Sequence, residues 1–266
     1  MNNESPALHQ MNPQSRFSDR AKNYAEYRPS YPGAVIDCIL SGLDNFQLIA
    51  ADIGAGTGIS SRLLANRGIQ VMAIEPNAAM RGVAEAHPLV EFRDGSAENT
   101  GLPDASVDLV TCFQAFHWFN PEPALKEFAR ILKPQGRLAA VWHNRNREDE
   151  FTSEYMTLTK TTSSYNCELR VGIEKFFSEL SHSTQKFFKS SSWFDPVRHF
   201  TFSYQQALSN KALIGRAMSN SYIPQEGKVH DQFIQDLTNL HQRYSDKQGL
   251  VYLQYKTSVY LTELSA

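Results

Sequence analysis

Short apolar runs alternate with helical patterns through the first half of this chain, and this alternation constrains its fold more than any other feature. Five of these runs read as buried strands by their length and apolarity, at about residues 48–53, 69–75, 89–94, 107–113 and 136–143. Helices are expected between them, over about 57–66, 77–86 and 120–133. Strands that alternate with helices form βαβ units, so we expect a parallel sheet with helices on both faces. In such a sheet, ligands bind at the carboxyl ends of the strands, where the strand order reverses.

The pattern changes after His143. The segment 148–195 has helical character, is polar and aromatic-rich, and is too long to be a loop, so we predict an inserted helical cap over the site. A strand is predicted over 199–204, two helices near 206–219 and 227–244, and a closing antiparallel strand over 250–264. The predicted fold is therefore α/β, with a seven-stranded, mostly parallel sheet whose last strand is antiparallel.

Composition and residue spacing argue against several kinds of binding partner. The chain has 266 residues with a formal net charge of −2, and no basic run, so nothing attracts it to nucleic acid or to an anionic membrane. Three widely spaced cysteines without a CxxC motif indicate reduced thiols in the cytoplasm. We expect no secretory signal and no membrane span, because the first residues are polar and no apolar stretch is long enough. The histidines show no ligand spacing with Asp, Glu or Cys, so no metal site is predicted.

A glycine-rich turn, DIGAGTG at residues 52–58, follows the first predicted strand. Glycines there let the backbone approach a ligand closely at a helix N-terminus. A dinucleotide turn would have glycine where Ile59 stands, and the GK[ST] sequence of a phosphate loop is absent. Taken alone, the turn has a tight strand-to-helix connection as its alternative explanation.

An acidic residue strengthens the case for a nucleoside ligand. Glu75 ends the second predicted strand, about 20 residues after the turn, where a carboxylate can accept both hydroxyls of an adenosyl ribose. A solvated strand end is the alternative for Glu75 alone. Turn and acid together, both at carboxyl ends of strands, favour the nucleoside interpretation.

Four segments match a known motif series in both order and spacing: DIGAGTG at 52–58, IEPN at 74–77, DGSAE at 94–98 and LPDASVDLV at 102–110. In these segments the chain resembles the class I S-adenosylmethionine-dependent methyltransferases. Three further segments, at 17–32, 113–119 and 219–224, are similar to a small-molecule branch that includes the trans-aconitate methyltransferases.

The resemblance implies a Rossmann-like fold, S-adenosyl-L-methionine as the cofactor and S-adenosyl-L-homocysteine as the product. It implies methyl transfer to a small-molecule acceptor, and the trans-aconitate analogy suggests a carboxylate oxygen. A lid over residues 1–32 is expected to cover a methyltransferase domain of 33–147 and 196–266, with the cap at 148–195. We expect a cytoplasmic monomer that binds neither nucleic acid nor membrane.

The resemblance also implies cofactor contacts. Asp52, Gly54, Ala55 and Gly56 would line the methionine part, and Glu75 would hold the ribose. Further contacts, around the adenine or beside the cofactor, are implied for Pro76, Asn77, Met80, Ser96, Ala97, Glu98, Gln114 and Phe116.

The lid would bring an aromatic ring and a cation, Tyr24 and Arg28, towards the cofactor. An aromatic face beside a sulfonium gains something like a cation–π contact, roughly 0.5–2 kcal/mol. The aromatic residues of this segment can equally serve to pack it onto the domain.

Methyl transfer from a sulfonium mainly requires alignment of the reacting atoms and exclusion of water. A general base is needed only if the acceptor is protonated. His117 is the candidate catalytic residue, as base or orienting group, because burial would favour its neutral form; a purely structural histidine is the alternative. Arg145 could bind a substrate carboxylate. The candidate substrate residues are His117, Trp118, His143, Arg145 and Tyr222.

Three other functions are compatible with parts of the sequence. A NAD-dependent oxidoreductase is disfavoured by Ile59 in the glycine turn, and a nucleic-acid methyltransferase by the charge and by the missing (N/D)PP(Y/F) tetrapeptide. A non-catalytic S-adenosylmethionine-binding protein is a further alternative, because a protein can keep its cofactor contacts after it has lost its catalytic activity.

Overall fold

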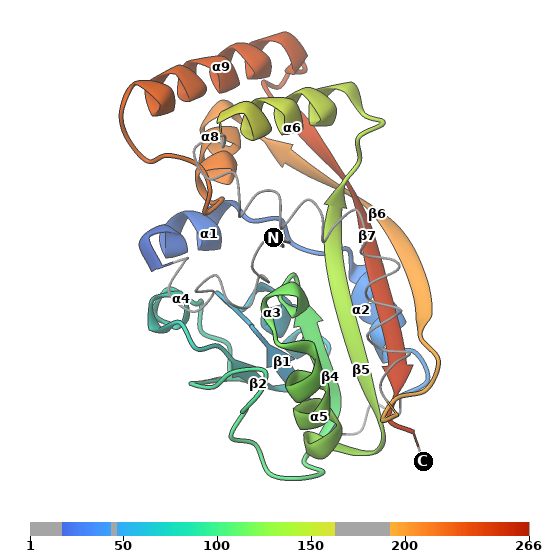
Figure 1. Cartoon of the computed structure of the whole chain (residues 1–266). Coiled ribbons are helices and arrows are strands. Elements are labelled where there is room, and N and C mark those ends of the chain that lie inside the picture. The colour runs from blue at the N-terminus through green and yellow to red at the C-terminus, as the bar shows by residue number, and fades with distance from the viewer. Residues whose placement is uncertain (1–17, 44–46, 163–191, 266) are drawn as a thin grey trace, which may run out of the picture.

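The computed structural model describes residues 18–43, 47–162 and 192–265. Within this part of the chain, seven strands form one sheet in the order β3-β2-β1-β4-β5-β7-β6. The strands are β1 (Ile49–Ile53), β2 (Gln70–Ile74), β3 (Val90–Arg93), β4 (Val107–Phe113), β5 (Leu132–Arg145), β6 (Arg198–Leu208) and β7 (Val251–Glu263). The first five are parallel, and β7 runs antiparallel to both of its neighbours, β5 and β6. The order reverses between β1 and β4, as the predicted fold requires (Figure 1).

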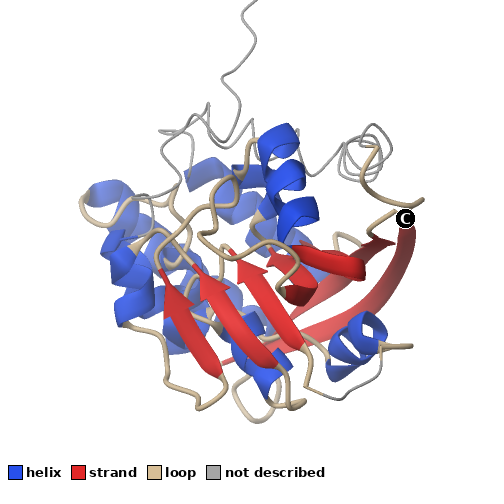
Figure 2. Cartoon of the chain, turned by 90° about the horizontal axis from the view of Figure 1, so that it is seen from below, coloured by secondary structure: helices blue, strands red, loops and turns tan. Residues whose placement is uncertain are grey.

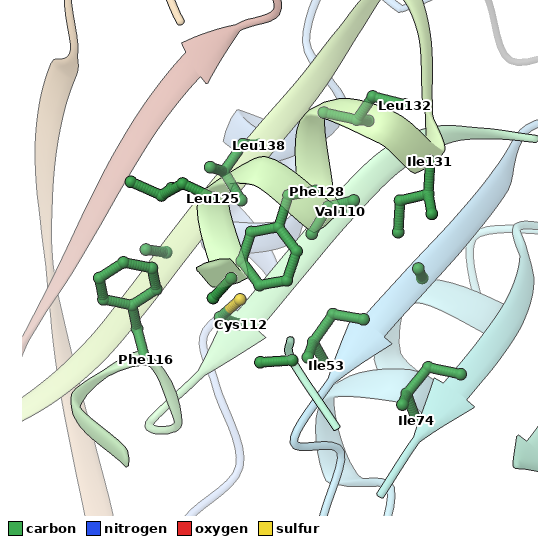
Figure 3. Packing of buried hydrophobic residues seen from close by; sticks show 14 of the residues in the cluster. Ile53, Ile74, Val110, Cys112, Phe116, Leu125, Phe128, Ile131, Leu132 and Leu138 are labelled. Carbon is green, nitrogen blue, oxygen red and sulfur yellow. The ribbon is translucent and has the colours of Figure 1, made fainter. Parts of the chain in front are cut away.

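Helices cover both faces of the sheet (Figure 2). On one face lie α2 (Gly33–Leu40) and α3 (Ile59–Ala65), whose apolar residues share a core with Val71, Leu109 and Val141. On the other lies α5 (Pro121–Ile131), whose Leu125, Phe128 and Ile131 pack against β1, β4 and β5 (Figure 3). Each helix buries one apolar stripe on the sheet, which is the packing that their sequence periodicity predicts.

Short helical elements lie close to the ends of the strands. They are η2 (Ser18–Arg20), α1 (Ala21–Tyr27), α4 (Ala78–Gly82) and η3 (Phe116–Trp118). The α4 helix begins at Asn77, whose side chain accepts hydrogen bonds from the amides of Ala79 and Met80. It is shorter than the predicted 77–86 helix and ends at Gly82, a residue type that is unfavourable within helices.

Three helices form a separate group beyond the sheet, which we term the helical lobe: α6 (Glu150–Thr162), α8 (Asn210–Met218) and α9 (Lys228–Tyr244) (Figure 1). Their apolar side chains share a core with the adjoining ends of β6 and β7. Helix α6 is the described helix of the predicted cap. Residues 163–191 of that cap and residues 1–17 of the predicted lid lie outside the described part of the chain.

Two strand boundaries differ from the sequence prediction. Strand β6 continues to Leu208, through residues predicted to begin a helix, because it pairs with β7 along its whole length. Helix α8 starts only after Ser209, whose hydroxyl accepts a hydrogen bond from the amide of Ala212. Strand β5 starts early because Leu132 pairs with Val107 ahead of a bulge, and the regular ladder resumes at Arg137.

None of the helices in the described ranges combines the length and the apolarity needed to cross a membrane.

Candidate active site

A cavity of about 300 Å³ opens at the carboxyl ends of the parallel strands, beside the reversal point between β1 and β4. This volume is at the lower end of the range typical of small-molecule sites. Eleven of the predicted cofactor contacts line it: Tyr24, Gly54, Gly56, Glu75, Pro76, Asn77, Met80, Ser96, Ala97, Glu98 and Gln114. The predicted substrate residue Trp118 lines it as well.

The glycine turn contributes one wall of this cavity. Gly54 and Gly56 have positive φ values of 69° and 59°, a region that favours glycine. A Cβ atom at Gly54 would lie 2.7 Å from the Cβ of Ala115, closer than side-chain carbons approach one another. The turn therefore needs glycine both for its backbone conformation and for its contact with the segment after β4.

Glu75 is held rigidly at the end of β2. Its Oε2 accepts a hydrogen bond from the Gly56 amide at 2.9 Å, and its Oε1 accepts one from the Asn77 amide at 2.8 Å. The side chain is buried, which raises the pKa of the carboxyl group, while the two backbone N–H groups favour the charged form. Each oxygen has two lone-pair directions, so both can still accept a hydrogen bond from a hydroxyl group of a ligand in the cavity.

The loop after β3 and the start of α5 form the opposite wall. The carboxylate of Glu98 accepts a hydrogen bond from the Asn120 amide at 2.8 Å and so ties the two segments together. Ala97 in this wall and Met80 in α4, beside the glycine turn, are almost fully buried and give the cavity apolar surface. An apolar wall beside a few fixed polar groups suits a flat, partly apolar ring such as a nucleobase.

Gln114 turns the chain away from β4 into the cavity wall. It adopts a positive φ of 54°, which is uncommon for a residue other than glycine. Its side-chain amide donates to the carbonyl of His143 at 2.9 Å, and its backbone amide donates to the carbonyl of Val141 at 2.8 Å. These two bonds hold a conformation that is strained on its own, and such strain is frequent at functional sites.

The sequence analysis missed five lining residues: Gly95, Phe113, Ala115, Phe119 and Asn120. All of them lie within or directly after two segments already singled out, DGSAE and FQAFHWF. Treating each segment after a strand as one continuous wall would have identified them.

Four predicted cofactor contacts do not line the cavity: Arg28, Asp52, Ala55 and Phe116. The fully buried carboxylate of Asp52 accepts hydrogen bonds from the hydroxyls of Ser60, Ser61 and Thr111, at 2.6, 2.6 and 2.9 Å. Burial raises the pKa of this carboxyl group. These hydrogen bonds fix the first residue of the glycine turn to α3 and β4.

Phe116 points into the core rather than into the cavity (Figure 3). Its ring packs edge-on against Trp142 at 6.4 Å and against Phe119 at 5.9 Å between centroids. The tight turn of η3 separates it from Trp118, which faces the cavity two residues later.

His117 lies half-buried beside the cavity wall but is not among its lining residues. Burial lowers the pKa of its imidazole to about 3, so the ring is neutral near pH 7. Its Nδ1 accepts a hydrogen bond from the indole Nε1 of Trp142 at 3.4 Å, which assigns the ring proton to Nε2. In that tautomer Nε2 is a donor, so the geometry suits an orienting group better than a general base.

His143 has partners for both of its ring nitrogens. Nε2 lies 2.7 Å from the carbonyl oxygen of Ser30, and Nδ1 lies 2.7 Å from the hydroxyl of Thr257. The ring stacks between Tyr31 and Tyr204, with centroids 4.4 and 5.2 Å away. This arrangement fastens the segment after α1 to the sheet, and a substrate bond to either nitrogen would have to displace one of these partners.

The two remaining substrate candidates, Arg145 and Tyr222, are brought close together although 77 positions separate them in the sequence. Arg28 lies over the ring of Tyr24 at 4.5 Å and donates to the carbonyl of Ser219 at 3.1 Å. No group of three or more His, Cys, Asp or Glu side chains in the described ranges is arranged to hold a metal ion.

Part of the chain matches a known family model. Residues 51–140 match the model of a family described as a methyltransferase domain. This match covers the glycine turn, Glu75 and the segment after β4.

The structural comparison extends over most of the chain. A candidate type II methyltransferase of Anaeromyxobacter dehalogenans superposes with a TM-score of 0.64 at 22% identity, covering 88% of this chain and 97% of that one. The chain has a Rossmann-like methyltransferase fold. A candidate methyltransferase from an antibiotic biosynthesis pathway of Anabaena variabilis shares this methyltransferase fold, with a TM-score of 0.62 at 24% identity, covering 88% of this chain and 98% of that one.

Sequence relatives also carry the name methyltransferase. An uncharacterized methyltransferase-like protein of Schizosaccharomyces pombe is 39% identical over 136 residues, which are 49% of this chain and 52% of that protein. An uncharacterized methyltransferase of Mycobacterium tuberculosis is 40% identical over 131 residues, 49% of this chain and 53% of the relative. The chain thus spans about half the length of the curated relatives it matches. Their names specify no acceptor, so the resemblance to trans-aconitate methyltransferases stays a prediction.

Proposed function

We propose that the protein is an S-adenosylmethionine-dependent methyltransferase that acts on a small-molecule acceptor, with a carboxylate oxygen as the favoured accepting atom. The observation that carries the proposal is the cavity at the strand reversal, where the glycine turn meets a carboxylate fixed by two backbone amides.

The residues of the cavity fit this cofactor. Side chains at Gly54 and Gly56 would crowd the turn, so the absence of Cβ atoms leaves room for a ligand to approach the backbone. Glu75 would hold the ribose hydroxyls, and the walls formed by Pro76, Met80 and Ala97 would enclose the adenine. When bound, the cofactor would supply a methyl group activated by its positively charged sulfur, with S-adenosylhomocysteine as the leaving group.

The protein's own part in this reaction is to align the acceptor and to exclude water. Trp118 and Phe119 line the cavity with aromatic surface that can shield the reacting atoms from solvent. A carboxylate acceptor carries its lone pair without deprotonation, so no general base is needed. That fits a neutral His117 acting as a donor that orients the acceptor.

One structural neighbour was solved with the product of the proposed cofactor. The phosphoethanolamine N-methyltransferase 2 of Haemonchus contortus, solved with phosphomonomethylethanolamine and S-adenosylhomocysteine, superposes with a TM-score of 0.53 at 14% identity, covering 97% of this chain and 60% of that one. We propose the same cofactor for this chain, and a cytoplasmic monomer as its working form.

The decisive experiment is calorimetric titration of the full chain with S-adenosylhomocysteine, with NAD titrated in parallel. We expect micromolar binding of the first and none of the second. Binding of NAD alone would mean that the glycine turn serves a dinucleotide and would overturn the proposal. If S-adenosylhomocysteine binds, a screen of small carboxylic acids for methyl transfer then separates an enzyme from a non-catalytic cofactor-binding protein.

A further inference from the structure

Three arginine side chains meet beside the cofactor cavity, although they come from α1–α2, β5 and α8. Arg28 and Arg216 are brought together by Asn220, whose Oδ1 lies 3.4 Å from an Nη atom of each. Arg145 lies over the ring of Tyr155, with its guanidinium carbon 5.2 Å from the ring centroid. We term these residues, Arg28, Arg145 and Arg216, the arginine cluster.

The arginine cluster is short of hydrogen-bond partners. Among the described residues, the buried Nε atom of each of the three guanidinium groups has no hydrogen-bond partner, and neither has the hydroxyl of Tyr155. Arg216 is only 3% exposed and Tyr155 is fully buried, so bulk water does not compensate these groups. Buried polar groups are nearly always satisfied, and four unsatisfied donors in one place call for an acceptor.

No carboxylate of the described residues forms an ion pair with the arginine cluster. Within residues 18–43, 47–162 and 192–265, every ion pair involves other basic side chains. In the same ranges, six groups near the arginine cluster interact with its charges. Four are tyrosines from α1, α6, β7 and the loop after α8, namely Tyr24, Tyr155, Tyr222 and Tyr255, and the other two are Tyr31 and His143.

The charges act on one another and on these tyrosines. Burial and the neighbouring charge of Arg216 lower the pKa of Arg28 to about 10. Burial raises the pKa of Tyr255, but the charges of Arg216, Arg145 and Arg28 outweigh it and leave that pKa below its ordinary value. Three like charges therefore converge on one volume, an arrangement that costs stability unless an anion joins it.

The arginine cluster adjoins the cavity through two side chains. Tyr24 lines the cavity, and the guanidinium group of Arg28 lies over its ring. Gln114 lines the cavity and bonds the carbonyl of His143, two residues before Arg145 in β5. A small molecule that reaches from the cavity past Tyr24 would meet the guanidinium groups.

From this geometry we infer that the arginine cluster is an anion-binding site that anchors the acceptor through one carboxylate or phosphate group. That the bound anion belongs to the methyl acceptor rests on the proposed function. The anchored group is not the methyl-accepting atom, because bonds from several guanidinium groups withdraw the electron density that a nucleophile needs. The acceptor is thus expected to carry an anionic anchor in addition to the atom that receives the methyl group.

The test is calorimetric titration of the full chain with succinate and with inorganic phosphate, in low-chloride buffer, with and without saturating S-adenosylhomocysteine. We expect one of the two anions to bind, and neutral succinamide not to bind. Arg145→Gln and Arg28→Gln should each lower the affinity for the anion by at least about tenfold, as expected when a charge-assisted hydrogen bond is lost. Arg243→Gln, on the exposed ion pair with Glu154, is the matched control and should leave anion affinity unchanged.

The outcomes separate the two proposals. Preference for succinate identifies a carboxylate anchor, and preference for phosphate identifies a phosphate anchor. Binding of neither anion, or equal affinity in wild type, Arg145→Gln and Arg28→Gln, overturns the anion site even if S-adenosylhomocysteine binds. If the wild type binds an anion but does not bind S-adenosylhomocysteine, the proposed function is refuted and the anion-binding site stands. Arg216 is nearly fully buried, so the test relies on the two less buried arginines and does not depend on that variant folding.

Discussion

Replacing Glu75 by alanine tests the core of the proposed cofactor site. The substitution removes the carboxylate expected to accept the ribose hydroxyls, and a hydrogen bond to a charged group is worth about 1–3 kcal/mol, or roughly 5- to 150-fold in affinity. It also leaves the amides of Gly56 and Asn77 without their acceptor, at distances that are now 2.9 and 2.8 Å. We therefore expect weaker binding of S-adenosylhomocysteine together with a lower stability of the free protein.

Two measurements keep these effects apart. Calorimetric titration gives the affinity, and urea unfolding of the ligand-free protein gives the stability. Glu75→Gln retains one side-chain oxygen and should fall between wild type and Glu75→Ala in both. Glu91→Ala is the control, because Glu91 is exposed on the neighbouring strand and pairs only with Arg93 among the described residues. Unchanged affinity in a folded Glu75→Ala variant would refute the assignment of Glu75 to the ribose.

Three further outcomes follow from the same geometry. Gly54→Ala should destabilise the protein by about 1–3 kcal/mol more than Gly42→Ala in urea unfolding, since both glycines have positive φ but only Gly54 would crowd Ala115; equal losses would contradict this. Burial lowers the pKa of His143 to about 4, so the folded state binds fewer protons than the unfolded chain between about pH 6.5 and 4, and stability falls as the pH drops through that window by roughly 2–4 kcal/mol. His143→Phe should flatten this part of the unfolding free energy measured against pH, and an unchanged slope would argue against it. His117 stays neutral above about pH 3, so the pH profile of kcat with any accepted substrate should show no step near pH 6.5, and such a step lost in His117→Gln would reinstate a general base.

Much of the fold could be predicted from local patterns. The apolar runs and helical periods identify the seven strands and the helices that cover the sheet, because each element must bury one stripe or face. Parallel strands place their carboxyl ends at one edge, so the glycine turn, Glu75 and the segment after β4 were expected to meet, and they line one cavity.

Side-chain direction at the site was decided by tertiary packing. Phe116 and Trp118 lie in the same aromatic segment, and only the space left beside Trp142 and Phe119 decides that Phe116 enters the core. The carboxylate of Asp52 is occupied by three hydroxyls, two of them from α3 and one from β4. No pattern in the sequence states which partner a buried group will find.

The sequence by itself determined the order of the elements, the position of the glycine turn and the place of Glu75, because these depend on neighbours along the chain. The tertiary structure alone decided the arginine cluster. Its members are separated by more than 60 residues from one another, and a side chain that is ordinary in sequence becomes a buried charge only when distant elements close around it. Local periodicity carries information about secondary structure, whereas burial and electrostatic environment are properties of contacts between segments, which exist only in the folded chain.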